Sequence, residues 1–355
     1  MKKYPLALSI ALMVAGLLAF IFYLYFFVGI SDIIEVFSRV NPYNYSLFYS
    51  ITIIAMVLSM LFYAMSWNTL LRALSIDTGL KKAFIYCWLG NFVDLIVPIE
   101  TVSGEIVRAY LIHRDYKDAG RIAAAIISHR IITIFVTASS MLIASIILIF
   151  KYKVSVGTLC LLVATIAGSI ALIILLLYVS LSEGAAEIIS NALTRIASSI
   201  LGRSRLDPSK VREKMYRGLI QLHGGFKSFG RKRRILIKSV AFSFIAWALH
   251  LSVYLLVFYA LGFSEVSTKI IESIVVYTIS VTVQSAPISL PLGLVEIVMT
   301  DLYKLFNIPA AIGGTATLLI RTVTFWLQVA VGYALAQLIG VKEIIERGSK
   351  KTSTC

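Results

Sequence analysis

The chain has 355 residues, of which 59% are hydrophobic and 14% are charged, and its mean hydropathy is +0.89. This composition excludes a soluble globular protein, because a soluble domain has too little interior for so much apolar surface. About 20 apolar residues cross a bilayer as a helix, and the strand-like alternation of a membrane barrel is not seen. The sequence therefore predicts an all-α polytopic membrane protein.

The formal net charge of +15 raises the question of a nucleic-acid partner. The Lys and Arg residues, however, cluster beside apolar stretches, as they do in the cytoplasmic loops of membrane proteins. We therefore predict no nucleic-acid binding. Cys87, Cys160 and Cys355 have neither the spacing of a disulfide framework nor that of a zinc site, so no metal or cofactor is predicted.

Residues 1–44 are predicted to form a first transmembrane span and an external loop. Lys2 and Lys3 place the amino terminus in the cytoplasm. The apolar run near residues 5–29 is about twice as long as a signal-peptide core and lacks a clear small-residue cleavage site. It is therefore a retained span, and the loop from Ser31 to Asn44 is external.

Residues 45–150 are predicted to form a repeat that begins and ends with a long apolar span. Between these spans, Ala83–Val97 is too short to cross a bilayer comfortably, and Ser103–Ile112 is shorter still. Pro98 separates the two short stretches. Their lengths agree with a broken helix, or with two half-helices that fold back as a re-entrant hairpin.

A linking span at residues 151–181 precedes a basic cytoplasmic connector at residues 182–235. From Ser182 to Lys238, 13 Lys and Arg residues stand against four acidic residues, and the run Arg231–Arg234 is entirely basic. We expect the connector to be a solvated segment that touches anionic head groups. The alternative is a docking site for another protein.

A second copy of the repeat is predicted at residues 236–341. Its long spans again flank short apolar segments, which are broken by Pro287 and Pro291. Residues 342–355 follow as a basic cytoplasmic tail. Both termini are therefore predicted to be cytoplasmic.

The two copies are related by a shift of 191 positions. This shift places Glu105 on Glu296 and Arg130 on Arg321, so each copy has Glu and Arg 25 residues apart. Because the single linking span between the copies belongs to neither of them, the two copies enter the membrane from opposite sides. The sequence thus predicts an inverted repeat with two broken-helix or re-entrant hairpins, as in transporters with a central site. The alternative is a chance resemblance between apolar helices.

The helix starts within the two hairpins are candidate anion sites. Glu105 and Arg108 are three residues apart, on one face of the short helix that begins after Gly104. Unpaired amides at such a start attract an anion. Glu296 follows Gly293 in the same way. We expect both starts to point toward the middle of the membrane and to form a cradle for a phosphate head group.

Arg130 and Arg321 lie within apolar helices, where a charge costs about 3 kcal/mol and needs a partner or a water-filled cavity. Glu105 and Glu296 are the expected partners. The alternative is that these are buried ion pairs that only hold helices together.

Further polar residues are expected to line the same cavity. Asn91 and Asp94 are three residues apart on the first half-helix, with a position near the surface as the alternative for Asp94, and Thr324 and Gln328 continue a polar stripe from Arg321. The candidate substrate-binding residues are therefore Asn91, Asp94, Glu105, Arg108, Arg130, Glu296 and Arg321. No catalytic motif is present, and the connector is too small for a typical catalytic domain, so we predict that the chain is not an enzyme.

In these residues the chain resembles the flippase-like lysylphosphatidylglycerol synthase transmembrane family, over nearly its whole length. The resemblance rests on Gly104-Glu105 with Arg108, on Arg130, and on Glu296 with Arg321. That family includes the amino-terminal flippase domain of bacterial multiple peptide resistance factor. The resemblance implies movement of modified lipids between leaflets, without the aminoacyl-transferase domain that is attached in that protein.

This chain departs from the family pattern at two places. It has His129, Arg130 and Thr133 where the family usually has Glu-Arg and a following Asp. It has Ser289–Pro291 where the family usually has a glycine pair before the second acid. The contacts with the head group are therefore expected to differ.

The leading hypothesis is a flippase-like, multi-pass translocator of the cell membrane that carries a phospholipid or a polyprenyl-phosphate lipid. Its expected partners are the membrane and an anionic or phosphate-bearing lipid, together with a possible second copy of the chain or a transferase. One alternative is an ion-coupled secondary transporter of a small polar solute. Another is a membrane subunit that serves a lipid-modifying transferase.

Overall fold

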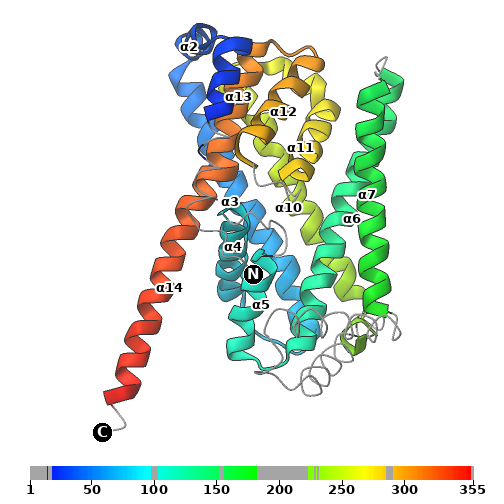
Figure 1. Cartoon of the computed structure of the whole chain (residues 1–355), viewed down its shortest axis with the longest axis vertical. Helices are drawn as coiled ribbons and strands as arrows, with labels where there is room; N and C mark the ends of the chain where they lie inside the picture. Colours follow the sequence, from blue (N-terminus) through cyan, green and yellow to red (C-terminus); the bar gives the residue numbers. More distant parts are fainter. Residues whose placement is uncertain are drawn as a thin grey trace, which may run out of the picture. The chain divides into compact units, whose positions relative to one another are not determined.

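The structure is a computed structural model, and within the residues that it describes the chain is helical and contains no strand (Figure 1). Among these described residues, five helices are long and apolar enough to cross a membrane, or six if one bent pair is counted as a span. The prediction of an all-α polytopic membrane protein is therefore confirmed. The described residues are 14, 18–96, 103–151, 156–181, 223–227, 229, 232–284 and 291–352.

The long spans owe their form to continuous apolar sequence. They comprise α3 (Pro42–Ala73), α6 (Ala119–Lys151), α10 (Arg233–Ala260), the 3-10 turn η2 with α11 (Ser264–Gln284), and α13 with the helix that continues it (Ala310–Gly340). The predicted linking span is α7 (Val156–Leu181), which packs along α6. Most of the predicted connector lies outside the described residues, as do Lys2 and Lys3.

Each predicted hairpin contains two short helices. The first has α4 (Leu80–Ile96) and α5 (Ser103–Asp115), and the second has α11 (Ile270–Gln284) and α12 (Pro291–Leu305). Leu292 and Gly293 are not helical, so the regular part of α12 begins at residue 294. Pro98 and Pro287, which we expected to break the helices, lie outside the described residues, as do Ser289 and Leu290 of the departure from the family pattern.

The order of helices is the same in both predicted copies. The shift of 191 positions carries the start of α3 at Pro42 onto the start of α10 at Arg233, and the start of α6 at Ala119 onto that of α13 at Ala310. It also carries the start of α5 at Ser103 to residue 294 of α12. This agreement supports an internal repeat, and the inversion of one copy relative to the other stays a prediction.

The described helices belong to two compact units that cut across the copies. One unit includes Leu61–Ala83 and Ala109–Leu249, and the other lies within Leu6–Met60, Phe84–Arg108 and His250–Cys355. The second unit therefore holds most of α4 and the start of α5 together with α11, α12 and α13. Candidate residues from both hairpins thus occur within a single compact unit.

Within the first unit, serines join α3 to α10. The hydroxyl oxygen of Ser66 lies 2.7 Å from that of Ser239 and 2.8 Å from that of Ser243, and it donates to the Ser239 carbonyl at 2.9 Å. Small hydroxyl side chains allow apolar helices to approach closely and to bond across their interface. These serines are therefore a helix-packing contact.

The predicted external loop from Ser31 to Asn44 is mostly helical, which corrects the sequence prediction. It contains α2 (Ile30–Arg39), which is bent by 80° from the preceding helical segment (Leu18–Val28). Gly29 makes the bend possible, because its φ of 90° is accessible mainly to glycine. Ile33 at the buried face of α2 contributes to the apolar cluster that packs beside α13, and this burial favours a helix over a loop.

Candidate functional site

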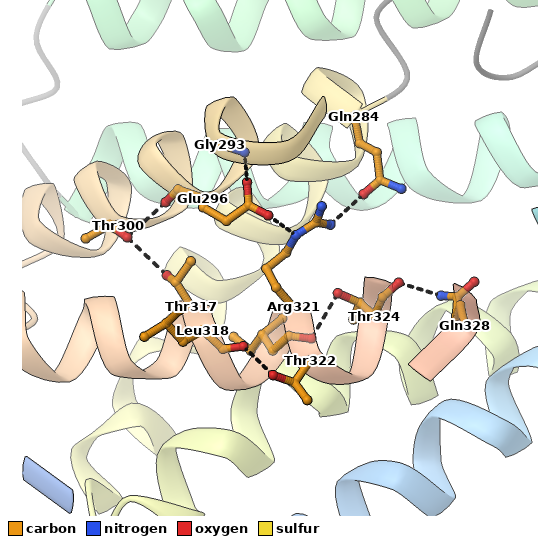
Figure 2. A network of polar contacts seen from close by, with 11 residues as sticks. Gln284, Gly293, Glu296, Thr300, Thr317, Leu318, Arg321, Thr322, Thr324 and Gln328 are labelled. Atoms are coloured by element: carbon orange, nitrogen blue, oxygen red, sulfur yellow. Dashed lines mark hydrogen bonds and ion pairs between the residues drawn. The ribbon is translucent and has the colours of Figure 1, made fainter. Parts of the chain in front are cut away.

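Arg321 and Glu296 form an ion pair in the interior of the second unit (Figure 2). Arg321 Nε donates a hydrogen bond to Glu296 Oε1 at 2.6 Å, and Arg321 Nη1 donates to Gln284 Oε1 at 2.9 Å. Both charged side chains are only 4% exposed. The structure thus brings the two expected partners into contact, and it adds Gln284, which links α11 to the pair.

The start of α12 explains why Glu296 lies at this place. Gly293, with a φ of 92°, turns the chain directly before the regular helix, and its N–H donates to Glu296 Oε2 at 2.6 Å. Glu296 is the third residue of that helix, so it reaches back to the residue before the helix as in a capping box. Its negative charge also lies at the positive end of the helix dipole. Glu296 therefore caps α12 and pairs with Arg321 at the same time.

Arg321 is the last residue of α13 (Ala310–Arg321). It is followed by a π-helical turn, η3 (Thr322–Trp326), and then by α14 (Leu327–Thr352). Single π-helical turns inside longer helices often occur at functional sites. The guanidinium carbon of Arg321 lies 4.9 Å from the ring centroid of Phe325, within cation–π range. The turn therefore places an aromatic face beside the buried cation.

The polar stripe beside Arg321 bonds mainly to its own helices. Thr324 donates to the Ile320 carbonyl at 2.9 Å, and Gln328 donates to the Thr324 carbonyl at 2.8 Å. Thr300 donates to the Glu296 carbonyl at 2.9 Å, so its hydroxyl does not solvate the ion pair (Figure 2). Arg321 Nη2, in contrast, is buried and has no hydrogen-bond partner among the described residues.

The start of α5 in the first hairpin is capped from α4. Asp94 Oδ1 accepts hydrogen bonds from the Gly104 N–H at 2.6 Å and from the Ser103 hydroxyl at 2.8 Å. A Cβ atom at Gly104 would lie 2.3 Å from both Asp94 Oδ2 and the Gly90 carbonyl oxygen. Two glycines therefore allow α4 and α5 to approach closely enough for this cap.

These caps differ from the expected cradle of unpaired amides. The Gly104 amide donates to Asp94 and the Gly293 amide donates to Glu296, so a carboxylate of the protein already occupies each helix start. The physical reason is that a nearby carboxylate accepts hydrogen bonds from the N–H groups at the helix start, which would otherwise be buried without a partner. The cation of Arg321 is thus the stronger candidate for contact with a phosphate.

Glu105 and Arg108 form a second pair on α5. Glu105 Oε1 lies 3.8 Å from Arg108 Nη2, and the Arg108 side chain is 4% exposed. Part of this burial comes from α4, because a Cβ atom at Gly90 would lie 3.1 Å from Arg108 Cγ. Asn91, also on α4, has its Nδ2 4.0 Å from Met60 Sδ, which is a weak contact.

Arg130 lies on α6, in the other compact unit. Its carbonyl accepts a hydrogen bond from Thr133 at 2.9 Å. The neighbouring His129 is buried, with its ring centroid 4.4 Å from that of Tyr63 in an edge-on contact. The pairing of Arg130 with Glu105 stays a prediction.

The two hairpins meet within the second unit. Leu95 of α4 packs in one apolar cluster with Leu292 and Phe325. Trp88 Nε1 donates to the Gln328 carbonyl at 3.2 Å, so α4 also bonds to α14. The first half-helix of one predicted copy therefore lies against the long helix of the other copy.

Gln284, which bonds directly to Arg321, is a residue that the sequence interpretation missed. A usable signal existed, since Gln284 is a polar residue at the end of an apolar half-helix, close to the place that Asp94 has in the first hairpin. Among the described residues, no group of three or more His, Cys, Asp or Glu side chains is arranged to hold a metal ion.

Comparison with known proteins identifies one matching family and several related membrane proteins. The family described as the lysylphosphatidylglycerol synthase transmembrane region matches residues 8–332. A UPF0104 membrane protein of Pyrococcus horikoshii is 25% identical over 295 residues, which cover 80% of this chain and 85% of that protein. Another, from Methanothermobacter thermautotrophicus, is 25% identical over 94% of this chain and 92% of its own length. A third, from Methanocaldococcus jannaschii, is 23% identical over 99% and 100%. No solved structure matches the chain.

Proposed function

Because the chain belongs to the lysylphosphatidylglycerol synthase transmembrane region family, and is a multi-pass membrane protein, we propose that it moves a phosphate-bearing lipid between the leaflets of the cell membrane. The lipid is a phospholipid or a polyprenyl phosphate, and the process is transport rather than catalysis. The observation that supports this proposal most is Arg321 Nη2, a buried donor without a hydrogen-bond partner among the described residues.

A phosphate is the ligand that this donor fits best. A guanidinium group presents several donors in a fixed plane and binds phosphate oxygens with charge-assisted hydrogen bonds. In Arg321, Nε and Nη1 are used by Glu296 and Gln284, which hold the group in one orientation. The remaining Nη2 is therefore preorganised. An ionisable group inside a membrane protein is a functional candidate, because burying it without a role is costly.

The role of Glu296 is to balance this cation in the absence of lipid. Its carboxylate shares its charge between Arg321 and the Gly293 amide at the start of α12. In our proposal Arg321 holds the phosphate, and the acyl or prenyl chains stay in the bilayer. Arg108 and Glu105 contribute a second charged pair in the same unit.

The proposal predicts that the purified full-length protein translocates lipid in vesicles. The test uses phosphatidylcholine vesicles that contain a trace of phosphatidylglycerol with a fluorescent acyl chain, and an external reductant that bleaches only the outer leaflet. We expect nearly all of the fluorescence to be bleached when the protein is present, and only the outer-leaflet share in protein-free vesicles. Retention of an encapsulated dye excludes leakage as the cause. Uptake of a polar solute without lipid movement would contradict the proposal.

We further propose that both termini are cytoplasmic, which follows from the basic connector and tail. In a cysteine-free background, a cysteine at Ser264, before α11, is expected to react with an impermeant maleimide in intact cells. A cysteine at Ser209, in the connector, is expected to react only after permeabilisation. Labelling of the Ser209 position in intact cells would contradict this orientation and the inverted repeat with it.

A further inference from the structure

A group of buried tyrosines lies beside the Arg321–Glu296 pair. The tyrosine cluster consists of Tyr254 on α10, Tyr277 on α11 and Tyr303 on α12, each at most 5% exposed. The ring centroids of Tyr254 and Tyr277 are 5.2 Å apart in an edge-on contact. The ring of Tyr303 makes a similar contact with Phe258 of α10, at 5.0 Å. Three helices thus contribute an aromatic ring with a hydroxyl group to one buried region.

On α11 the tyrosine cluster shares a helix face with the residue that binds Arg321. Tyr277, Ser280 and Gln284 are spaced by three and four residues, and such residues lie on one face of a helix. Gln284 accepts its hydrogen bond from Arg321 at the end of this face. Ser280, between them on this face, donates to the Val276 carbonyl at 2.6 Å.

On α12, too, a tyrosine of the cluster shares a helix face with a residue that binds Arg321. Glu296, Thr300 and Tyr303 are spaced by four and three residues, so Tyr303 lies on the face of α12 that carries the acid. The Tyr254 hydroxyl is near enough to interact electrostatically with Arg321, with Glu296 and with the Tyr303 hydroxyl. The tyrosine cluster and the ion pair therefore lie near each other inside the second unit.

Two donors of this region lack partners. The Tyr303 hydroxyl and Arg321 Nη2 are buried, and neither has a hydrogen-bond partner within the described part of the chain. A buried polar group without a partner is destabilising, and native proteins rarely retain one without a reason. An unpaired hydroxyl and an unpaired guanidinium nitrogen in one region indicate a ligand that carries both a phosphate and hydroxyl groups.

We propose that the tyrosine cluster binds the hydroxylated part of the head group, a glycerol or a sugar, while Arg321 binds the phosphate. This inference rests on the proposed function and specifies its substrate class. Tyrosine and serine hydroxyls both donate and accept hydrogen bonds, which suits a polyol. An amine head group would need an available carboxylate, whereas Glu296 is already bonded to Arg321 and Gly293.

The test compares lipids of equal charge that differ in whether the head group carries hydroxyl groups. Delipidated full-length protein is titrated, by native mass spectrometry, with phosphatidylglycerol, phosphatidylinositol and phosphatidylethanol of matched acyl chains. All three are singly charged phosphodiesters, and phosphatidylethanol lacks a head-group hydroxyl. We expect at least one of the two hydroxylated lipids to bind about tenfold more tightly than phosphatidylethanol, as for one or two hydrogen bonds. Which of the two binds more tightly distinguishes a sugar from a glycerol.

The variant Tyr303→Phe is expected to lose most of this preference for hydroxylated lipids. Its melting temperature should be unchanged or higher, since removing an unpaired buried hydroxyl does not destabilise the fold. Tyr254→Phe provides a second variant with the same expected loss of preference. Tyr333→Phe is the matched control, because Tyr333 lies on α14 with 59% of its surface exposed, and it should behave as the unmodified protein.

Two results would overturn the inference. One is equal binding of phosphatidylethanol and both hydroxylated lipids by the unmodified protein, and the other is an unchanged preference in both Tyr→Phe variants. Either result leaves lipid translocation in vesicles intact, so the inference can fail while the proposed function stands. If the protein translocates no lipid at all, the proposed function fails and the inference fails with it.

Discussion

Replacing Arg321 with Ala is expected to abolish lipid translocation while the protein still inserts into the membrane. The substitution leaves Glu296 buried without its cation, and breaking a buried ion pair in this way costs about 3–5 kcal/mol. Gln284 loses its donor as well. Without the guanidinium the phosphate also loses its charge-assisted hydrogen bonds, so we expect the translocation rate to fall by about a hundredfold. The vesicle assay measures this rate, and gel filtration reports whether the protein remains monodisperse.

The double substitution Glu296→Gln with Arg321→Gln separates a binding role from a structural one. A purely structural ion pair can often be neutralised together with little loss. The glutamine at position 296 also retains an oxygen that can accept from the Gly293 amide. We therefore expect the double variant to be folded and monodisperse, yet inactive in lipid translocation.

A matched control is the neutralisation of the exposed pair Arg72–Asp77, whose Nε–Oδ1 distance is 3.2 Å. Exposed pairs contribute at most about 1 kcal/mol, so this control should transport normally. Normal transport by the Glu296/Arg321 double variant would instead show that the buried pair is only structural. The site would then have to be sought around Asn91, Asp94 and Arg108.

The second large effect is expected at Gly104. In Gly104→Ala the new methyl group would lie 2.3 Å from Asp94 Oδ2 and from the Gly90 carbonyl oxygen, so α4 and α5 must separate. Overpacking of this kind costs about 1–3 kcal/mol, and loss of the Asp94 cap adds about 1 kcal/mol. We expect a lower melting temperature in detergent and weaker translocation, because α4 and α5 of the first hairpin can no longer pack closely.

Gly168→Ala is the control for this substitution. Gly168 lies within α7, and a Cβ atom there would meet no atom within 4 Å. Alanine is also the better helix former, so the melting temperature should stay the same or rise slightly. An unchanged melting temperature in Gly104→Ala would contradict the close approach of α4 and α5.

The sequence alone determined the helical fold and the partnership of Glu296 with Arg321. Long apolar runs can satisfy their backbone groups in a membrane only as helices or closed barrels, so the fold class follows from local composition. The partnership was predictable because charges are rare in apolar helices, and few acids are available to balance Arg321. Helical spacing likewise predicted that Thr324 and Gln328 share a face with Arg321.

Only the tertiary structure decided which groups bond to one another across helices. Asp94 caps α5, a bond that helical spacing did not predict, and its place in the lining of a cavity stays a prediction. Gln284 and the tyrosine cluster were not predicted at all, although each residue is visible in the sequence. The physical reason is that periodicity shows which face of a helix a residue occupies, but not which helix packs against that face. That choice depends on how helices cross, and for α4 and α5 the crossing depends on the close contact between Gly90 and Gly104, which brings Asp94 to the start of α5.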